Sequence, residues 1–494
     1  MKYVLGLDLG TSSLKGLLVS KNGEVVISCS SDYPVLYPEL GFSEQDPREW
    51  IYAVKTVIKQ ILTEVPFAKN NIEAISFSGQ MHSLVLIDDA GVPIRNAILW
   101  NDVRTTKECA YITEKIGEDL IKVTKNRALE GFTLPKILWI MQNERDVWKK
   151  VHHFLLPKDY LGFWFTGNKQ MEFSDAAGTL LLDIEKKAWS SHILKAFNIP
   201  ENICPKLVNS TDKIGTVRKE IANELGIETE VAVYAGGADN ACAAIGSGIA
   251  REDTGLSSIG TSGVFLSYEG NSVKDYKGTL HFFNHVVKDC YYSMGVTLSA
   301  GNSLSWFKKT FAEKLNFEEL LDDIDRIEIG SNNLLFTPYL LGERTPYADS
   351  QIRGSFVGID VNHTKLHFTR AILEGITFSL KDSMKIMQNN AGKQFKRIVS
   401  IGGGARNRHW LQMQADIFDS TILTLKAEQC PSLGAAMIAA VGKGWYEDFK
   451  SCADKFVIFD NTFYPVQKHV EKYKKNYELY KRVYPATKSI YMTN

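Results

Sequence analysis

Closely spaced cysteines are absent from this sequence. Its seven cysteines lie far apart along the 494 residues, and no two of them form a CxxC motif. An odd number of scattered cysteines favours neither a disulfide framework nor a cysteine-based zinc site. The chain also lacks any uninterrupted apolar stretch of about 18 residues, the length that a membrane-spanning helix needs. We therefore expect a soluble protein of a reducing cytoplasm, with no membrane partner.

Net charge is absent as well. The 57 lysines and arginines balance 57 aspartates and glutamates, so the chain generates no overall positive field to attract nucleic acid, and we expect no nucleic-acid partner. Hydrophobic residues make up 44% of the chain and charged residues 23%, which is the balance of a folded protein. A chain of 494 residues is too long for one hydrophobic core, so several domains are expected.

The two common nucleotide-binding motifs are missing. No Walker A sequence occurs, and the glycines Gly402, Gly403 and Gly404 after the apolar residues 398–401 do not have GxGxxG spacing. Three glycines between a strand and a helix still allow a ligand to approach the backbone closely. A nucleotide would therefore have to bind by another route.

The N-terminal residues are typical of three antiparallel strands. Residues 3–8, 14–19 and 24–30 are rich in β-forming side chains and are separated by two turns. Asn22-Gly23 predicts a type I′ hairpin turn between the second and third strands. The first turn is Gly10-Thr11-Ser12, which is polar and exposes its backbone.

That first turn has an internal echo 250 residues later. Gly10-Thr11-Ser12 recurs as Gly260-Thr261-Ser262, again between two apolar stretches, and Asp8 is matched by Ser258. The echo begins each half of the chain, which favours two similar domains. We place the domains at residues 1–248 and 249–494.

The segment from Asp8 to Lys15 could bind a phosphate. A tight turn offers backbone N–H groups and the hydroxyls of Thr11 and Ser12, and together these form a concavity suited to an anion. A neighbouring carboxylate such as Asp8 suits Mg²⁺, which prefers oxygen ligands and bridges to phosphates. The alternative is a simple hairpin turn in which Asp8 accepts local hydrogen bonds.

Asp239 follows the paired glycines Gly236 and Gly237 and precedes a helix of small residues. One interpretation is a helix N-cap, which stabilises a helix by about 1 kcal/mol. The other is a carboxylate at a cleft that takes a proton from an attacking hydroxyl. In phosphoryl transfer, accepting this proton is the main chemical step that a protein side chain performs. The residues alone leave both open.

Polar side chains gather at the ends of two further apolar segments, and such a cluster suits a small polyhydroxylated ligand. A lone histidine is more often structural and a methionine is more often part of the core, so the cluster binds a ligand only if its segments converge. The residues concerned are Gln80, Met81, His82, Trp100, Asn101, Asp102 and Arg104.

Several stretches together resemble one enzyme family. Residues 131–139 (GFTLPKILW) are similar to its first signature, and residues 354–359 (GSFVGI) with His367, Ala371 and Glu374 are similar to its second. Residues 156–160, 174–179 and 342–346 also match, in order and with consistent spacing. On these residues the chain resembles the FGGY carbohydrate kinases over essentially its whole length, most closely the members that phosphorylate xylulose.

The resemblance implies an α/β fold of two ribonuclease H-like, actin/hexokinase-type domains with an active-site cleft between them. It makes Asp239 the catalytic base, ionised near neutral pH if it keeps the ordinary aspartate pKa of about 3.9. It makes Asp8 the acid that positions Mg²⁺ and ATP. The same resemblance assigns nucleotide contacts to Gly10, Thr11, Ser12, Lys15, Gly260, Thr261, Gly301, Gly403 and Asn407.

For the sugar, the resemblance implies contacts from Met81, His82, Asp239 and Asn240, with Gln80, Asp102 and Arg104 as further candidates. The expected reaction is ATP-dependent phosphorylation of D-xylulose to D-xylulose 5-phosphate, by an enzyme that could be a homodimer. Ser83 and Val103 depart from the family pattern beside the expected sugar pocket. Kinases of L-ribulose, L-fuculose or another polyol, and a non-sugar actin-like ATPase, therefore remain alternatives.

Overall fold

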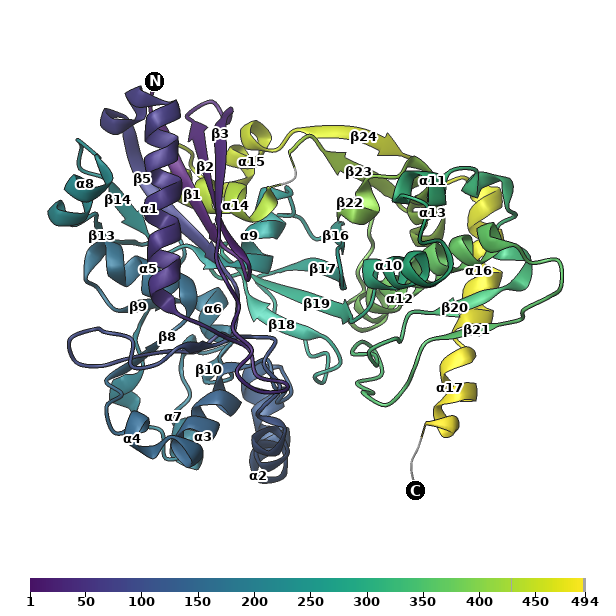
Figure 1. The fold of residues 1–494 in the computed structure, drawn as a ribbon, viewed down its shortest axis with the longest axis horizontal. Coiled ribbons are helices and arrows are strands. Elements are labelled where there is room, and N and C mark those ends of the chain that lie inside the picture. Colours follow the sequence, from purple (N-terminus) through teal and green to yellow (C-terminus); the bar gives the residue numbers. More distant parts are fainter. Residues whose placement is uncertain (428, 492–494) are drawn as a thin grey trace.

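The computed structural model describes residues 1–427 and 429–491. Two lobes are built around two seven-stranded sheets, which lie side by side along the long axis of the molecule (Figure 1). We call the lobe around the N-terminal sheet the first lobe and the other the second lobe. Within the described ranges, no helix is both long and apolar enough to cross a membrane.

The first sheet begins with the expected meander. β1 (Tyr3–Leu9) pairs antiparallel with β2 (Ser13–Ser20), and β2 pairs antiparallel with β3 (Val25–Asp32). The strand β5 (Ile72–Gly79) lies parallel to β1 on its other side. The sheet is completed by β13 (Lys213–Thr216), β14 (Ala232–Tyr234) and the short β15 (Gly237–Ala238).

The predicted type I′ turn between β2 and β3 is wrong. Only Gly23 has a positive φ, of 85°, whereas a type I′ turn needs positive values at two residues. The Gly23 amide donates to the Ser20 carbonyl over 3.0 Å, as in a type I turn followed by a left-handed glycine. A Cβ at Gly23 would lie 2.4 Å from the Lys455 carbonyl oxygen, so a tertiary contact also requires glycine here.

The second sheet repeats this plan. β16 (Thr254–Ile259) pairs antiparallel with β17 (Gly263–Gly270) and parallel with β22 (Arg397–Gly402), as β1 pairs with β2 and β5. The remaining strands of this sheet are β18 (His281–Asn284), β19 (Tyr291–Thr297), β23 (Thr421–Leu425) and β24 (Phe459–Phe463). Each sheet therefore opens with a polar Gly-Thr-Ser turn.

Helices cover both sheets. In the first lobe, α1 (Pro47–Glu64) begins after Asp46, whose carboxylate accepts from the Arg48 amide, and its apolar face is buried as its periodicity predicts. The principal helices of the second lobe are α10 (Gly301–Phe311), α12 (Lys365–Ala391), α13 (Arg408–Phe418) and α16 (Gln467–Tyr480).

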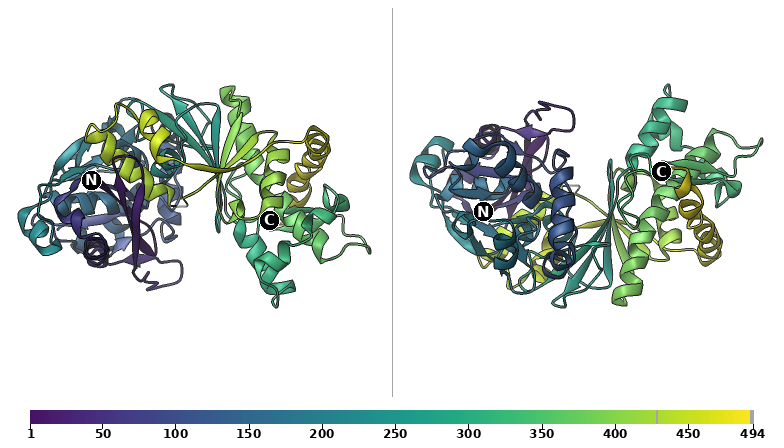
Figure 2. Two further views of the ribbon diagram at one scale, coloured as in Figure 1. Left: turned by 90° about the horizontal axis from the view of Figure 1, so that it is seen from above. Right: turned by 90° about the horizontal axis from the view of Figure 1, so that it is seen from below.

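The chain crosses between the lobes more than once. α14 (Cys430–Gly442) follows β23 of the second sheet but packs against β1, β5 and α9 (Asp239–Gly246) in the first lobe. A Cβ at Gly6 would lie 2.1 Å from the Ser432 carbonyl oxygen, so this packing is close. α15 (Phe449–Phe456) stays beside α14 before the chain returns in β24 (Figure 1, Figure 2). The domain boundary between residues 248 and 249 stays a prediction.

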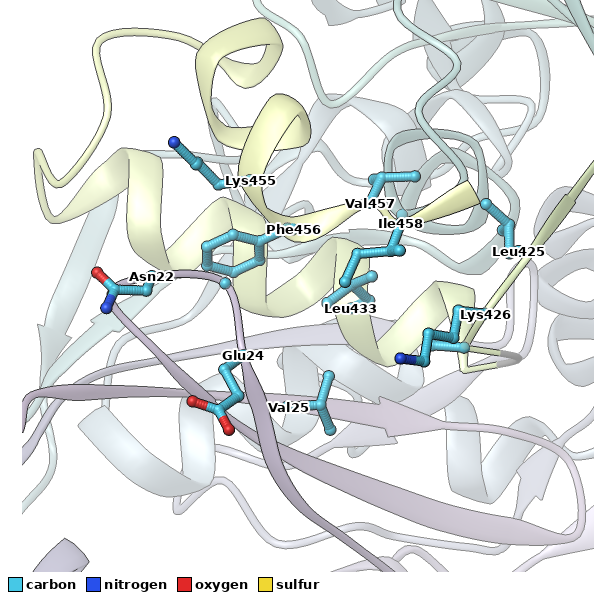
Figure 3. A pocket seen from close by; sticks show the side chains of 13 residues that line it. Asn22, Glu24, Val25, Leu425, Lys426, Leu433, Lys455, Phe456, Val457 and Ile458 are labelled. Carbon is cyan, nitrogen blue, oxygen red and sulfur yellow. The ribbon is translucent and has the colours of Figure 1, made fainter. Parts of the chain in front are cut away.

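A cavity of about 360 Å³ lies where these crossings meet (Figure 3). Its walls come from the turn at Asn22, from Leu425 at the end of β23 with Lys426 after it, and from Phe456 to Ile458 before β24. None of the site residues predicted from the sequence lines it. The cavity therefore belongs to the connection between the lobes.

An extension of the first lobe faces the second sheet. Its main elements are α2 (Thr106–Thr124), α3 (Thr133–Asn143), α5 (Pro157–Thr166), β9 (Gln170–Glu172) and α6 (Phe173–Ala177). The Asn126 side chain donates to the Phe282 carbonyl of β18 over 2.8 Å, and α6 packs on the same strand. The extension therefore contacts the second lobe through Asn126 and α6.

Candidate active site

Strand register brings the two candidate acids to one edge of the first sheet. Asp8 of β1 pairs with Ser78 of β5, and Ser78 pairs with Gly237 of β15. Asp239 follows two residues after Gly237 and begins α9. Residues 8, 78 and 239 therefore meet at the ends of three adjacent strands, although long stretches of sequence separate them.

Asp8 is held in place by a hydroxyl. The Ser78 Oγ donates to an Asp8 carboxylate oxygen over 2.9 Å. Burial raises the pKa of Asp8, and this rise is opposed by the Ser78 hydrogen bond and by the charge of Lys15, its register partner on β2. Ser78 was not identified from the sequence, because only the pairing of β1 with β5 brings it to Asp8.

Asp239 is not a helix cap in the structure. α9 begins at Asp239 itself after Ala238, and the Asp239 carboxylate accepts from the Asn240 amide over 2.6 Å and from the Asn240 side chain over 3.0 Å. Burial, reinforced by the charge of Asp8, raises the pKa of Asp239 to about 7. The expectation of full ionisation near neutral pH is therefore wrong, because it assumed a solvated carboxyl group.

A buried charge cluster supports the start of α9. Glu172 accepts from the Ser174 hydroxyl, and the Ser174 hydroxyl accepts from the Ala238 amide over 2.9 Å. Lys158 lies among Asp159, Glu172 and Asp175 at 2.5–3.4 Å, and all four side chains are almost entirely buried. Apart from Glu172, the residues of this cluster occur in family-like stretches, but the sequence gave them no role.

The first Gly-Thr-Ser turn is tied down by side chains from four places. Its Gly10 carbonyl accepts from the Tyr33 hydroxyl over 2.6 Å and from Gln80 over 3.4 Å. Its Thr11 hydroxyl accepts from the Trp100 indole over 2.9 Å, and its Thr11 carbonyl accepts from Gln45 over 2.5 Å. Gln80 is buried, so its contacts fix the turn.

Within the part of the chain that the structure describes, the second turn is held by backbone hydrogen bonds alone. The Gly301 amide donates to the Gly260 carbonyl over 2.8 Å, and the amides of Ala300 and Asn302 donate to the Thr261 carbonyl. A Cβ at Gly301 would lie 2.4 Å from the Gly260 oxygen, so the N-terminus of α10 approaches this turn closely. The structure thus brings together Gly260, Thr261 and Gly301, as their predicted shared role requires.

The glycine-rich segment after β22 reaches the same turn. Gly402 pairs with Ile259, and a Cβ at Gly402 would lie 2.6 Å from the Ile259 carbonyl oxygen. Gly403 follows at an exposed position, and Asn407 accepts from the Trp410 amide as the N-cap of α13. Gly403 therefore lies next to the second turn, while Asn407 has a structural contact of its own.

Met81 links the two lobes at the candidate sugar site. Its sulfur accepts from the Asn240 side chain and from the Tyr292 hydroxyl, each over 3.7 Å. Tyr292 lies on β19 of the second sheet, is fully buried and was not identified from the sequence. Met81 and Asn240, both predicted as sugar contacts, are therefore neighbours.

His82 has its ring fixed by a carbonyl. The distance from its Nδ1 to the Gly178 carbonyl oxygen is 2.7 Å, so Nδ1 carries the proton and donates. Burial lowers the pKa of His82 to about 3, which leaves the ring neutral and its Nε2 as a hydrogen-bond acceptor. The ring also packs against Phe132 with 4.5 Å between centroids. An acceptor in this position suits a sugar hydroxyl.

Asp102 and Arg104 are engaged with each other. The Asp102 carboxylate accepts from the Arg104 guanidinium at 2.7–3.0 Å and from the Ser43 amide, and the same guanidinium contacts Glu44. The Phe42 ring lies 3.7 Å from the guanidinium carbon. This pair fixes the loop after β7 (Ala97–Ile98). Its predicted contact with the sugar remains a prediction.

The two departures from the family pattern lie in different environments. Ser83 is buried, and its hydroxyl donates to the Gln80 side chain over 3.1 Å and accepts from the Trp100 amide over 3.0 Å. Val103 is 54% exposed. The Ser83 hydroxyl therefore supports the first turn indirectly, through its bonds to Gln80 and Trp100.

The residues present fit one magnesium ion that takes a single carboxylate from the protein and most of its ligands from phosphate and water. Among the described residues, no group of three histidine, cysteine, aspartate or glutamate side chains could hold a metal ion. Asp8 supplies one carboxylate next to the first turn, and Mg²⁺ commonly takes one or two carboxylates and completes its shell with phosphate and water oxygens. Asp8 would hold such an ion together with a bound nucleotide.

Comparisons with known proteins agree with this fold. The chain is 54% identical to the xylulose kinase of Lactococcus lactis over 97% of this chain and 95% of that protein. It is 52% identical to the xylulose kinase of Bacillus subtilis over 96% and 95%. The crystal structure of a xyloylose kinase from Brucella ovis superposes with a TM-score of 0.93 at 33% identity, over 99% of this chain and all of that one.

Family assignments cover both lobes. Residues 3–246 match the N-terminal domain of the FGGY family of carbohydrate kinases, and residues 255–442 match its C-terminal domain. The two matches begin just before the two Gly-Thr-Ser turns, so the internal echo marks corresponding places in the two domains. With two matched domains and full-length relatives, the chain belongs to the FGGY family of carbohydrate kinases.

Proposed function

We propose that this carbohydrate kinase transfers the γ-phosphoryl group of ATP to D-xylulose and forms D-xylulose 5-phosphate and ADP. Two relatives that are more than half identical over nearly the full chain are xylulose kinases. The observation that carries the proposal is the position of Asp239, whose buried carboxylate lies beside Asn240 and is coupled to the charge of Asp8. Asn240 also donates to the sulfur of Met81, which precedes the neutral acceptor His82 in the chain.

In this proposal Asp239 accepts the proton of the terminal sugar hydroxyl. The hydroxyl oxygen forms a bond to the γ-phosphorus, the bond from that phosphorus to the bridging oxygen breaks, and ADP leaves with the electron pair. A carboxylate whose pKa is about 7 is a stronger base than an ordinary aspartate and is still ionised above neutral pH. His82, Met81 and Asn240 would orient the sugar so that one hydroxyl reaches Asp239.

The nucleotide would lie between the two Gly-Thr-Ser turns. Gly10, Thr11, Ser12 and Lys15 would face the terminal phosphates, and Gly260, Thr261 and Gly301 would hold the rest of the nucleotide with Gly403 and Asn407. Mg²⁺, held in part by Asp8, supplies charge neutralisation for the phosphates when bound. Closure of the lobes would exclude water, which competes with the sugar as acceptor.

Family membership argues against one alternative function and leaves a second one open. The chain is a carbohydrate kinase, so the non-sugar actin-like ATPase is not supported. A kinase of L-ribulose, L-fuculose or another polyol would use the same base and the same turns. A homodimer also remains a prediction, and light scattering of the purified protein measures it directly.

The decisive experiment is ADP release by the purified protein with Mg²⁺ and ATP over a panel of ketoses, polyols and a blank without sugar. We expect strong turnover with D-xylulose and little with the others. A different preferred sugar would replace D-xylulose and keep the kinase mechanism. Turnover equal to the blank with every sugar would contradict the proposed function.

Asp239→Asn tests the base. The amide keeps the size of the side chain but cannot take up a proton, so we expect turnover to fall about 10²- to 10⁴-fold with the fold retained. Asp119→Asn, an exposed position on α2, is the matched control and should change nothing. Near wild-type turnover of Asp239→Asn would remove Asp239 from the role of base.

A further inference from the structure

His82 has an unusual backbone conformation. Its φ is 67°, in the left-handed region that only a few per cent of residues other than glycine adopt. Such a conformation costs about 1–2 kcal/mol and persists only where surrounding contacts hold it. His82 ends the segment that follows β5, and its ring is one of the groups that would contact the sugar. The contacts that hold its backbone therefore decide where its Nε2 points.

Two side chains from the start of α3 bind the His82 carbonyl. The Thr133 hydroxyl donates to it over 2.9 Å, and the Lys136 ammonium donates to it over 3.2 Å. We call Thr133 and Lys136 the carbonyl clamp. On the other side of the residue, the Gly178 carbonyl holds the ring Nδ1, and a Cβ at Gly178 would lie only 2.7 Å from that nitrogen. His82 is thus fixed at both its backbone and its ring.

Lys136 lies where a lysine is costly. Its side chain is completely buried, and it makes no ion pair with any residue of the described ranges. It also lies in the first turn of α3, where the helix dipole disfavours a positive charge. A buried amine without a carboxylate partner needs other acceptors. Its acceptors are two carbonyl oxygens, that of His82 and that of Gly131 at 2.5 Å.

The protonation of Lys136 agrees with this role. Burial lowers its pKa to about 7; Asp102 and Cys109 oppose the shift, and Arg104 adds to it. A neutral amine has two N–H donors, and the two carbonyls accept both. Charged or neutral, Lys136 can therefore keep its two hydrogen bonds near neutral pH.

We propose that the carbonyl clamp is a positioning device for the sugar site: Thr133 and Lys136 hold the His82 backbone in its left-handed conformation, so that the ring presents Nε2 to the sugar. Neither clamp residue touches the sugar or the reacting atoms. The clamp rests on the proposed function for its effect on turnover, but the geometry of the ring can be measured without any reaction.

Lys136→Met tests the clamp with a side chain of similar length that has no donor. We expect the KM for D-xylulose to rise about 10-fold, the effect of losing one charge-assisted hydrogen bond, while kcat falls less. We also expect the ¹⁵N resonances of the His82 imidazole to move from a single Nδ1–H tautomer toward the exchange-averaged values of a free ring. Thr133→Val should act in the same direction with a smaller effect.

The controls separate positioning from general damage. Thr133→Ser restores the hydroxyl and should restore both KM and the imidazole signals. Thr113→Val removes a similar bond, to the Cys109 carbonyl in α2, and should leave both unchanged. If Lys136→Met does not fold, Thr133→Val and Thr133→Ser provide the test by themselves.

The failure of the clamp and the failure of the proposed function give different results. Wild-type KM and wild-type imidazole signals in both clamp variants would overturn the clamp. A wild-type protein that does not phosphorylate D-xylulose would overturn the proposed function, while the imidazole signals of the variants would still test the clamp. A loss of kcat with unchanged KM and unchanged imidazole signals would also count against positioning.

Discussion

The two Gly-Thr-Ser turns have the same sequence but different surroundings. The first turn is bound by Tyr33, Gln45, Gln80 and Trp100, which come from four separate segments. The second is bound by the backbone amides of residues 300–302, and both its glycine and its threonine are exposed. One turn is therefore held rigidly by side chains and the other is shared with the N-terminus of a helix.

The residue two positions before each glycine differs as well. The first lobe has Asp8, whose charge adds to the burial that raises the pKa of Asp239, and the second lobe has Ser258. In the proposed function the repeated turn provides two phosphate-binding surfaces, but only the first lobe adds the acids that the chemistry would require. On that proposal, the repeat specifies where a nucleotide would lie, and the departures from the repeat specify which lobe would hold the reacting groups.

Within this comparison, the largest expected effect on turnover comes from replacing Asp8, the acid that only the first lobe has. Asp8→Asn removes the carboxylate that would position Mg²⁺ and ATP, and we expect kcat to fall about 10²- to 10³-fold. Ser258→Ala, the equivalent change in the second lobe, should alter kcat by less than about 3-fold, because this half-buried hydroxyl carries no charge and its loss removes little. Steady-state kinetics of the two variants measures both. Equal losses would mean that the two turns contribute alike.

A smaller effect is expected at the second turn. Gly301→Ala would place a methyl group 2.4 Å from the Gly260 carbonyl oxygen, so the turn and the helix must separate. At about 1–2 kcal/mol of strain, the KM for ATP should rise roughly 5- to 30-fold with the KM for sugar unchanged. Gly117→Ala, on α2 and outside the proposed nucleotide site, is the control, because its Cβ would meet no atom closer than 3.4 Å. An unchanged KM for ATP in Gly301→Ala would show that this contact does not shape the nucleotide site.

The smallest expected effect is on the pH dependence of kcat/KM, which should respond to Asp8 but not to Ser258. Because Asp239 must be ionised to act as a base and has a pKa of about 7, kcat/KM should rise with pH and reach half of its plateau near pH 7. Asp8→Asn removes the neighbouring negative charge, so the midpoint should move to lower pH in its residual activity. Ser258→Ala should leave the midpoint in place. A profile that is flat between pH 6 and pH 8 would contradict the raised pKa.

Much of the fold could be predicted from local patterns. The meander of β1, β2 and β3, the helix from Pro47 and the recurrence of the Gly-Thr-Ser turn all follow from short stretches of sequence, because strand and helix periodicities and turn residues act locally. The turn at Gly23 was predicted in the wrong class, because its conformation also depends on Lys455, more than 400 residues away. The return of α14 to the first lobe has no local signal either.

The candidate site divides in the same way. Asp8, Asp239, Met81 and His82 carry chemical groups that a pattern of residues can identify. Gln80 was grouped with them as a sugar contact, yet its side-chain amide donates to the first turn. The Ser83 hydroxyl in turn donates to the Gln80 side chain. Ser78, Tyr292 and Lys136 were missed as site residues, because each meets the site only through a strand pairing or a helix end.

By itself, the sequence determined the family, the two similar halves and the residue types that could carry phosphoryl transfer, because motifs of fixed spacing record local backbone geometry. Only the tertiary structure decided the protonation of Asp239, the tautomer of His82 and the partners of Asp102 and Arg104. These properties depend on burial and on groups brought together from distant parts of the chain, such as Asp8 with Asp239 and Gly178 with His82. Desolvation and charge interactions act through space, so residues that are remote in sequence determine the chemistry of the site.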